Sequence, residues 1–287
     1  MQERVRVRRD RPSALSWAFA LVVTMFAVWL VTLRPLRPAA QPAAAVRERV
    51  TQEVTLEGVE MYFAALGAYP DSGQARVDAA MLTQRGAAGV IWTEKEGCCL
   101  LGAGYPLEAD ARRIVRRLGE QEGLQAQVLR LSVPSVRLRV TATEDDIGAI
   151  MAADEALRAC LNRLSGLALQ IDRGETGDAS ARMLAAVARS ELEKAGKALA
   201  LVAGASEEPL CAGLIGQIDR LSGQLLDLSG SDLSGAALSG ALRCCHVDGW
   251  LQRSYWLEAS GGGKSVSKML SFDKNLTNCL SEDMIVR

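Results

Sequence analysis

The sequence contains a single histidine, few aromatic residues and no excess of charge of either sign. Among its 287 residues, 33 Lys and Arg balance 34 Asp and Glu, and Phe, Trp and Tyr together make up 5%. A nucleic-acid-binding protein normally carries a basic surplus, so this balance argues against nucleic acid as a partner. One histidine leaves little room for a His-based catalytic dyad or a His-rich metal site. Charged residues at 23% and apolar residues at 49% exclude a wholly disordered or collagen-like chain.

One long stretch without charge departs from this average composition. Residues 12–33 contain no Asp, Glu, Lys or Arg, and such a length matches the roughly 30 Å hydrocarbon core of a bilayer at about 1.5 Å per residue. Five arginines in residues 1–11 predict a cytoplasmic basic stub before a transmembrane helix. A cleaved signal peptide is the alternative, because Ala43, Ala44 and Ala45 resemble a cleavage site, but its apolar region is normally about 7–15 residues long. We therefore expect a single-pass protein of the cell membrane with an extracytoplasmic C-terminal part.

The exported part is expected to begin with a linker and a small α+β domain. Residues 34–53 contain three prolines and many alanines, which is typical of an extended linker. Over residues 54–132 the pattern predicts a strand at 59–69, a helix at 74–84, a hairpin from 88–93 and 98–102, a helix at 107–122 and a strand at 126–131. This βαββαβ order is the ferredoxin-like plan, which packs two helices on one face of a four-stranded sheet and leaves the other face open.

Helical periodicity follows a short predicted strand at 136–140. Thr143, with Asp146 three residues later, has the pattern of a capping box at the start of a helix. Apolar residues then recur with alternating spacings of 3 and 4 over residues 147–171, and only Asp154 interrupts this heptad seam. The pattern indicates a long helix with one buried stripe.

Two more apolar stripes, over residues 184–202 and 214–228, complete the helical part. Residues 141–242 are therefore expected to form an antiparallel three-helix bundle or coiled coil, which spaces the molecule or binds an envelope protein partner. Residues 243–287 include a run of three glycines and show no sustained periodicity, so we expect a flexible tail.

The end of the first strand carries a family resemblance. The run Ala64–Tyr69 reads AALGAY and matches, apart from Ala65 in place of Gln, the aliphatic-Gln-aliphatic-Gly-small-aromatic motif of sporulation-related repeat (SPOR) domains. Where that family has aromatic-Arg-aliphatic and then Gly-Pro-aromatic, the sequence has Cys98-Cys99-Leu100 and Ala103-Gly104-Tyr105. About a quarter of the chain, residues 57–132, thus resembles a SPOR domain. The resemblance implies an exported, membrane-anchored protein that binds peptidoglycan, favouring glycan strands stripped of peptides, in cell division or sporulation.

Alternation along the strands indicates which side chains could reach such a glycan. If Tyr62, Ala64 and Leu66 face the two helices, their neighbours face the open side of the sheet. Saccharides are held by apolar ring faces and a few hydrogen-bond donors. The candidate glycan-binding residues are accordingly Phe63, Ala65, Gly67, Tyr69, Trp92, Leu101 and Tyr105. The alternative is that these aromatic side chains are ordinary core residues.

No catalytic constellation stands out in the sequence. Ser265-Val266-Ser267-Lys268 fits the S-x-x-K pattern of penicillin-binding enzymes, but no K-T-G motif follows it. Cys244-Cys245-His246 lacks the C-x-x-C spacing of a zinc site. We therefore expect a protein that is not an enzyme and needs no metal or cofactor. Two functions stay open: an envelope protein that binds peptidoglycan, or a structural scaffold whose SPOR-like domain no longer binds glycan.

Overall fold

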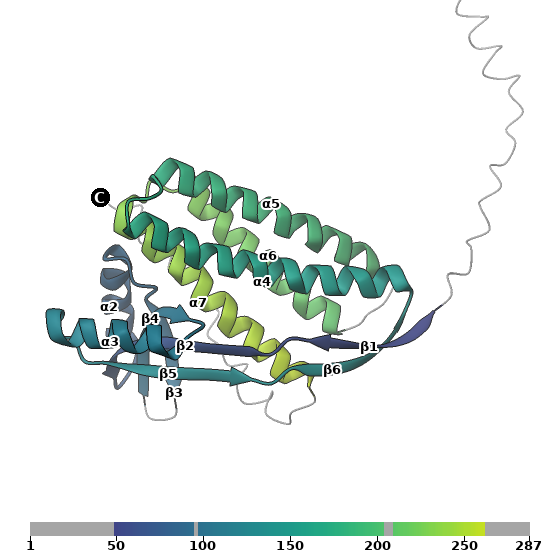
Figure 1. The fold of residues 1–287 in the computed structure, drawn as a ribbon, viewed down its shortest axis with the longest axis horizontal. Coiled ribbons are helices and arrows are strands. Elements are labelled where there is room, and N and C mark those ends of the chain that lie inside the picture. The colour runs from purple at the N-terminus through teal and green to yellow at the C-terminus, as the bar shows by residue number, and fades with distance from the viewer. Residues whose placement is uncertain (1–48, 95–96, 204–208, 262–287) are drawn as a thin grey trace, which may run out of the picture. The chain divides into compact units, whose positions relative to one another are not determined.

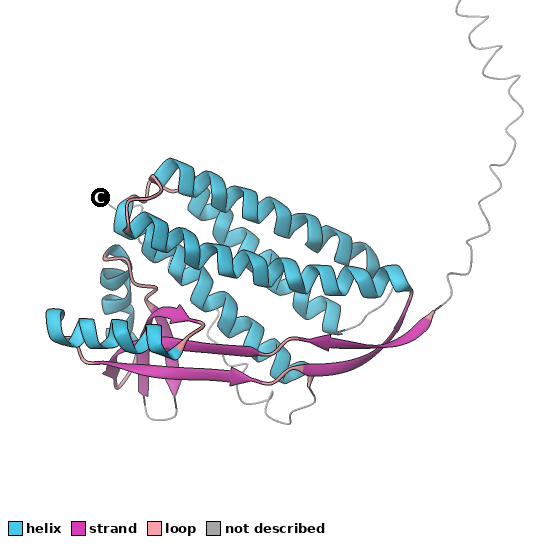
Figure 2. Cartoon of the chain, in the orientation of Figure 1, coloured by secondary structure: helices cyan, strands magenta, loops and turns pink. Residues whose placement is uncertain are grey.

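The computed structural model describes residues 49–94, 97–203 and 209–261. These residues form an α+β structure with two sheets and six helices, so the expected α+β class is confirmed (Figures 1 and 2). The predicted stub over 1–11, the predicted membrane span over 12–33 and most of the predicted linker lie outside the described residues.

The predicted βαββαβ unit is present over residues 59–133. Its elements are β2 (Val59–Tyr69), α2 (Ser72–Gln84), β3 (Val90–Glu94), β4 (Gly97–Tyr105), α3 (Glu108–Glu122) and β5 (Ala126–Val133). The four strands pair antiparallel in the order β3-β4-β2-β5. Asp71 begins α2 by accepting the backbone N–H groups of Gly73 and Gln74, and Gly123 ends α3 in the left-handed conformation.

A second, two-stranded sheet extends this unit. Strand β1 (Val50–Leu56) pairs antiparallel with β6 (Val136–Ala142), which confirms the predicted strand at 136–140. Residues 50–53 therefore belong to a strand, and the prediction that the linker continues to residue 53 is wrong. Val54 and Leu56 are buried, so this ribbon packs one face into the core while its other face is exposed.

Four helices, where three were expected, follow the strands. They are α4 (Glu144–Asp172), α5 (Asp178–Ala203), α6 (Pro209–Gly230) and α7 (Gly235–Ser260). The predicted capping box of Thr143 and Asp146 is confirmed at the start of α4. The prediction of a three-helix bundle is wrong, because α7 runs into the segment that was expected to be a flexible tail. Helix α7 ends at Ser260, and its buried residues extend as far as Leu257.

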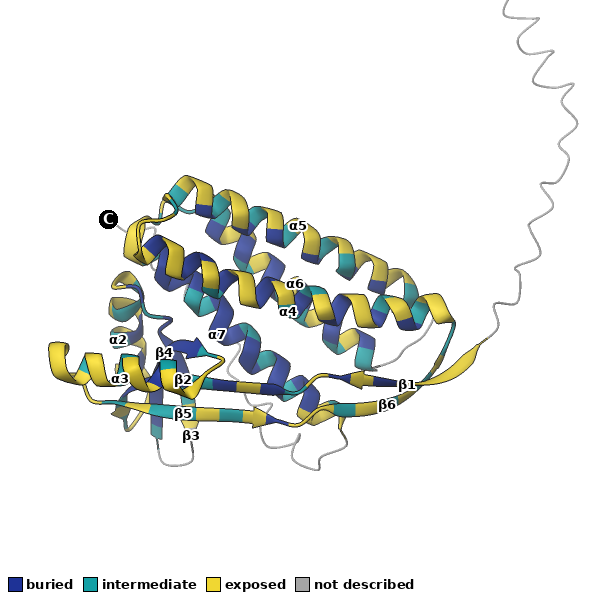
Figure 3. Ribbon diagram, viewed as in Figure 1, coloured by how far each residue is buried: buried dark blue, intermediate teal, exposed yellow. Residues whose placement is uncertain are grey.

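Helix α7 runs between the four-stranded sheet and the other long helices (Figure 1). It contacts all four strands of that sheet, as well as α2, α4 and α6. Small residues permit this close packing: a Cβ added to Gly240 would lie 2.2 Å from the backbone oxygen of Thr83, and one added to Gly249 would lie 2.2 Å from Leu161. Because it is enclosed on several sides, α7 is buried around most of its circumference (Figure 3).

The sheet is consequently packed on both faces. Leu66, Ile91 and Leu100 form a small cluster with Ala75 and Ala79 of α2. The opposite face belongs to a large core that continues through the β1–β6 ribbon and all four long helices. The expectation that one face of the sheet is open is therefore wrong, because α7 of the same chain covers it.

The membrane part of the expected architecture is also corrected. Within the described ranges, no helix combines the length and the apolar composition that crossing a bilayer requires. Membrane localisation stays a prediction from residues 12–33, which the structure does not describe.

Candidate functional site

The candidate glycan-binding residues on the central strands lie beneath α7. Phe63 and Leu101 are 0% exposed, and Ala65 is 1% exposed. Ala65 and Leu101 are paired across β2 and β4, and all three residues belong to the large core that includes α7. Alternation therefore predicts correctly which side chains share this face, but the face contacts protein. A ligand could reach these residues only if α7 moved away.

The ring of Phe63 is fitted to its neighbours within this interface. Phe63 pairs with Gly104 on β4 and with Leu129 on β5. A Cβ added to Gly104 would lie 2.9 Å from the ring of Phe63, so the glycine leaves room for the ring. Such close packing is typical of a core aromatic residue rather than of a stacking platform for a sugar.

Trp92, which lies on the edge strand β3, also contacts α7. Its ring stacks on that of Tyr255 in α7, with centroids 6.3 Å apart and an interplanar angle of 8°. Burial raises the pKa of Tyr255 to about 12, so its hydroxyl group stays neutral at physiological pH. The partly buried Trp92 thus contacts another aromatic residue of its own chain with one face of its ring.

Gly67 and Tyr69 lie together at the end of β2. Gly67 has a φ of +64°, a left-handed conformation that favours glycine, and its N–H donates to the backbone oxygen of Gln125 at 3.0 Å. The ring of Tyr69 lies against this glycine: a Cβ added to Gly67 would lie 3.1 Å from the Cζ atom of Tyr69. Burial and a hydrogen bond to the carboxylate of Asp78 raise the pKa of Tyr69 to about 12. Gly67 therefore connects the end of β2 to the residue that precedes β5, and Tyr69 connects it to α2.

Tyr105 lies apart from this pair. Across β2 and β4, Tyr105 is opposite Tyr62 whereas Tyr69 is opposite Cys98, so the two candidate tyrosines occupy opposite ends of the strand pair. Burial raises the pKa of Tyr105, and the nearby Arg243 opposes that shift. The seven candidates thus divide among the covered face, the β3 edge and the two strand ends, and they do not form one exposed surface.

A buried ionic network joins α7 to the rest of the molecule, and sequence analysis did not predict it. Arg253 is 0% exposed; it pairs with Asp154 of α4 and donates from Nη2 to the backbone oxygen of Glu57 at 2.8 Å. Arg158 adds a contact from its Nε to Asp154 Oδ2 at 3.3 Å and pairs with the Glu57 carboxylate. Burial lowers the pKa of Arg253, while the charge of Asp154 opposes this shift. The one sign of this network in the sequence is Asp154, a charged residue at an otherwise apolar seam position of α4.

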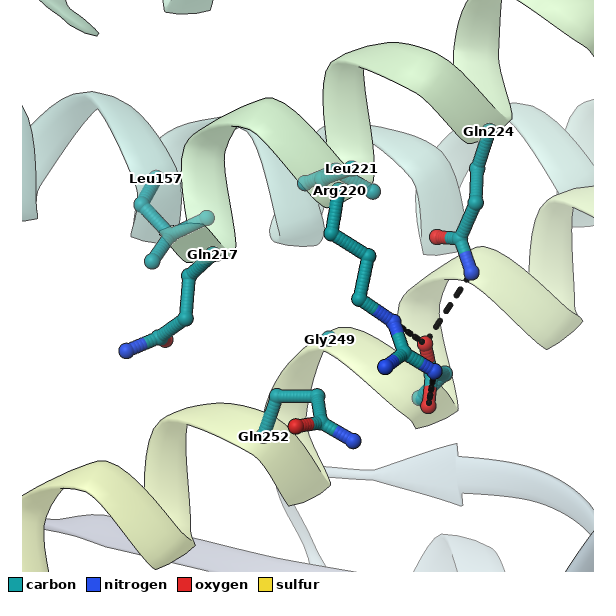
Figure 4. A pocket seen from close by; sticks show the side chains of 8 residues that line it. Leu157, Gln217, Arg220, Leu221, Gln224, Gly249 and Gln252 are labelled. Atoms are coloured by element: carbon teal, nitrogen blue, oxygen red, sulfur yellow. Dashed lines mark hydrogen bonds and ion pairs between the residues drawn. The ribbon is translucent and has the colours of Figure 1, made fainter. Parts of the chain in front are cut away.

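A second polar cluster lies between α6 and α7 (Figure 4). Arg220 Nε donates to Asp248 Oδ2 at 3.1 Å, and Gln224 Nε2 donates to the same oxygen at 3.0 Å. These groups line a small hollow together with Leu157, Gln217, Leu221, Gly249 and Gln252. The hollow has space for about one water molecule, which could satisfy the buried, unpartnered Oε1 of Gln217.

The single histidine is part of the core. His246 accepts a hydrogen bond from Trp250 Nε1 at 3.1 Å, and burial together with Arg243 lowers the pKa of His246 to about 4. Across the described ranges, no group of three His, Cys, Asp or Glu residues is placed to hold a metal ion. Six cysteines in these ranges are free thiols, and burial raises the pKa of both Cys160 and Cys245 to about 12.

Comparison with known proteins gave no match. No family model, no curated protein and no solved structure matches this chain.

Proposed function

We propose that this chain is a scaffold protein of the cell envelope, without enzymatic activity, in which a SPOR-like sheet serves to hold a helical platform. One observation supports this proposal over glycan binding. The side chains that alternation assigns to the ligand face, Phe63, Ala65 and Leu101, are at most 1% exposed and are covered by α7.

The character of the interface also favours a permanent structural role. Apolar burial is continuous from the ribbon through the sheet to the four long helices, so removal of α7 would expose a large part of the core. It would also leave the buried charge of Asp154 without Arg253. Both costs oppose opening of the sheet face for a ligand.

Binding of the full chain to purified peptidoglycan sacculi tests this proposal. The sacculi are used before and after an amidase removes the stem peptides, and cosedimentation of the chain is measured at several salt concentrations. We expect no salt-resistant binding to either preparation. Binding that increases after amidase treatment would overturn the scaffold proposal and favour the glycan-binding function.

A further inference from the structure

Helix α5 presents an apolar stripe that no described part of the chain covers. Its inward face, with Ala181, Ala185, Ala188, Leu192 and Leu199, packs mainly against α4 and α6. On the outer side, Leu184 is 42% exposed, Val187 is 45% exposed and Leu201 is 84% exposed. Figure 3 shows this outer surface of α5 at the edge of the molecule farthest from the sheet.

The outer residues follow a heptad pattern of their own. The stripe consists of Leu184, Val187, Glu191, Lys194, Ala198 and Leu201, all of which are exposed. Their successive spacings alternate between 3 and 4 residues, which is the spacing of a coiled-coil seam. Helix α5 therefore has one seam for its own bundle and a second seam that faces solvent.

The second seam is complementary to itself in the antiparallel direction. If two α5 helices cross at a two-fold axis between Glu191 and Lys194, each Glu191 lies opposite the Lys194 of the other copy. The same axis places Leu184 opposite Leu201, and Val187 opposite Ala198. We infer that a second copy of this chain binds here, with α5 packed antiparallel against α5 as an isologous dimer interface.

Charges favour this partner and this direction. Lys194 has no ion pair within the described ranges, whereas the carboxylate of Glu191 is 60% exposed and pairs with Arg163 of α4 at 2.7 Å. The antiparallel dimer supplies two Glu191–Lys194 pairs beside Arg163. A parallel dimer would instead place Glu191 opposite Glu191 and Lys194 opposite Lys194, which is unfavourable.

The neighbouring surface of α4 leaves room for a second helix. Ala159 and Gly166 lie on the same side of α4 as Arg163, four residues before it and three after it, and both are exposed. A Cβ added to Gly166 would meet no atom within 4 Å. The seam from Leu184 to Leu201 is about 26 Å long at about 1.5 Å per residue, so two copies can align several helical turns.

Sedimentation equilibrium of the full chain over a range of concentrations tests this inference, which does not rest on the proposed scaffold function. We expect a reversible dimer. Glu191→Lys and Lys194→Glu each create two like-charge contacts, so each should weaken dimerisation about tenfold or more. The double variant reverses both charges and should restore the dissociation constant to within about threefold of the original. Lys197→Glu makes the same charge change off the seam and should have little effect.

Any of three other outcomes of this experiment would overturn the proposal. A chain that stays monomeric at all concentrations has no such interface. A dimer that is insensitive to the single substitutions uses another surface, and failure of the double variant to recover would exclude the antiparallel register. Thermal unfolding of every variant, followed by circular dichroism, confirms that a change in mass does not come from loss of the fold. Sacculus binding is independent of these results, so this inference and the proposed function can fail separately.

Discussion

Substitution of Asp154 by Asn tests the network that holds α7 against the sheet. The change keeps the size of the side chain and an oxygen that accepts a hydrogen bond, but it removes the negative charge. Arg253 then stays fully buried with its positive charge uncompensated, and Arg158 loses one of its two acidic neighbours. Asp154→Asn should therefore destabilise the native state strongly.

The expected loss follows from the burial of the pair. Removal of one partner of a buried ion pair costs about 3–5 kcal/mol, whereas an exposed pair contributes about 0–1 kcal/mol. Glu53 and Arg137 form the matched exposed pair, with an N–O distance of 3.8 Å and side chains 63% and 78% exposed. Glu53→Gln should therefore lower the unfolding free energy by less than about 1 kcal/mol.

Urea unfolding followed by circular dichroism measures these differences. The double variant Asp154→Leu with Arg253→Met removes both buried charges and should recover to within about 2 kcal/mol of the original protein, because an apolar pair needs no compensation. A loss below about 1 kcal/mol for Asp154→Asn would refute the reasoning, since it would mean that water reaches Arg253. A double variant as unstable as the single one would show that charge burial is not the cause.

Two further changes test other parts of the interior. The pKa of His246 is about 4 in the native state and 6.5 ordinarily, so only the unfolded state gains a proton as the pH falls from about 6.5 towards 4. The unfolding free energy should therefore fall by up to about 3 kcal/mol over this range. Urea unfolding curves measured at a series of pH values should show this fall for the original protein and a smaller fall for His246→Gln. An unchanged pH dependence in the variant would contradict a neutral buried histidine. Gly240→Ala places a Cβ against the backbone of Thr83 and should lower stability by about 1–3 kcal/mol, whereas Gly216→Ala, which meets no atom within 4 Å, should raise it by about 0.5–1 kcal/mol. Equal thermal shifts for the two alanine variants would show that α7 and α2 are not in close contact.

The small α+β unit was predictable because its signals are local. Strands β2 to β5 alternate in side-chain direction. Asp71 begins α2 through short-range hydrogen bonds, and Gly123 ends α3 through its left-handed backbone conformation. The start of α4 at Thr143 was predictable for the same reason. These features need only a few neighbouring residues and depend little on the rest of the fold.

Helix α7 was missed because it is not amphipathic in the usual way. A helix with one solvated face shows an apolar stripe, but α7 packs against the sheet on one side and the other long helices on the other. Its first half contains small residues such as Ser239 and Gly240, which allow close approach and also resemble loop composition. The covering of the predicted ligand face could not be predicted without knowledge of α7.

The buried ionic network of Asp154 and Arg253 could likewise be predicted only in part from the sequence. Asp154 stands out in the sequence because a charge occupies a seam position. Its partner Arg253 is 99 residues away, in the segment that lacks a clear period. Sequence spacing marks the unusual residue, but only the tertiary structure identifies the group that compensates it.

Placement of a charge at Ala65 tests the central claim, that α7 covers the face of the sheet that was predicted to bind a ligand. Ala65 is 1% exposed on the covered face, whereas Ser132 is exposed on the other face of the same sheet and lies opposite Glu60. We predict that Ala65→Arg prevents folding or lowers the unfolding free energy by more than about 3 kcal/mol, since it buries an unpaired charge, while Ser132→Arg changes it by less than about 1 kcal/mol. Equal unfolding free energies for the two variants would show that the sheet face is open and would contradict the account.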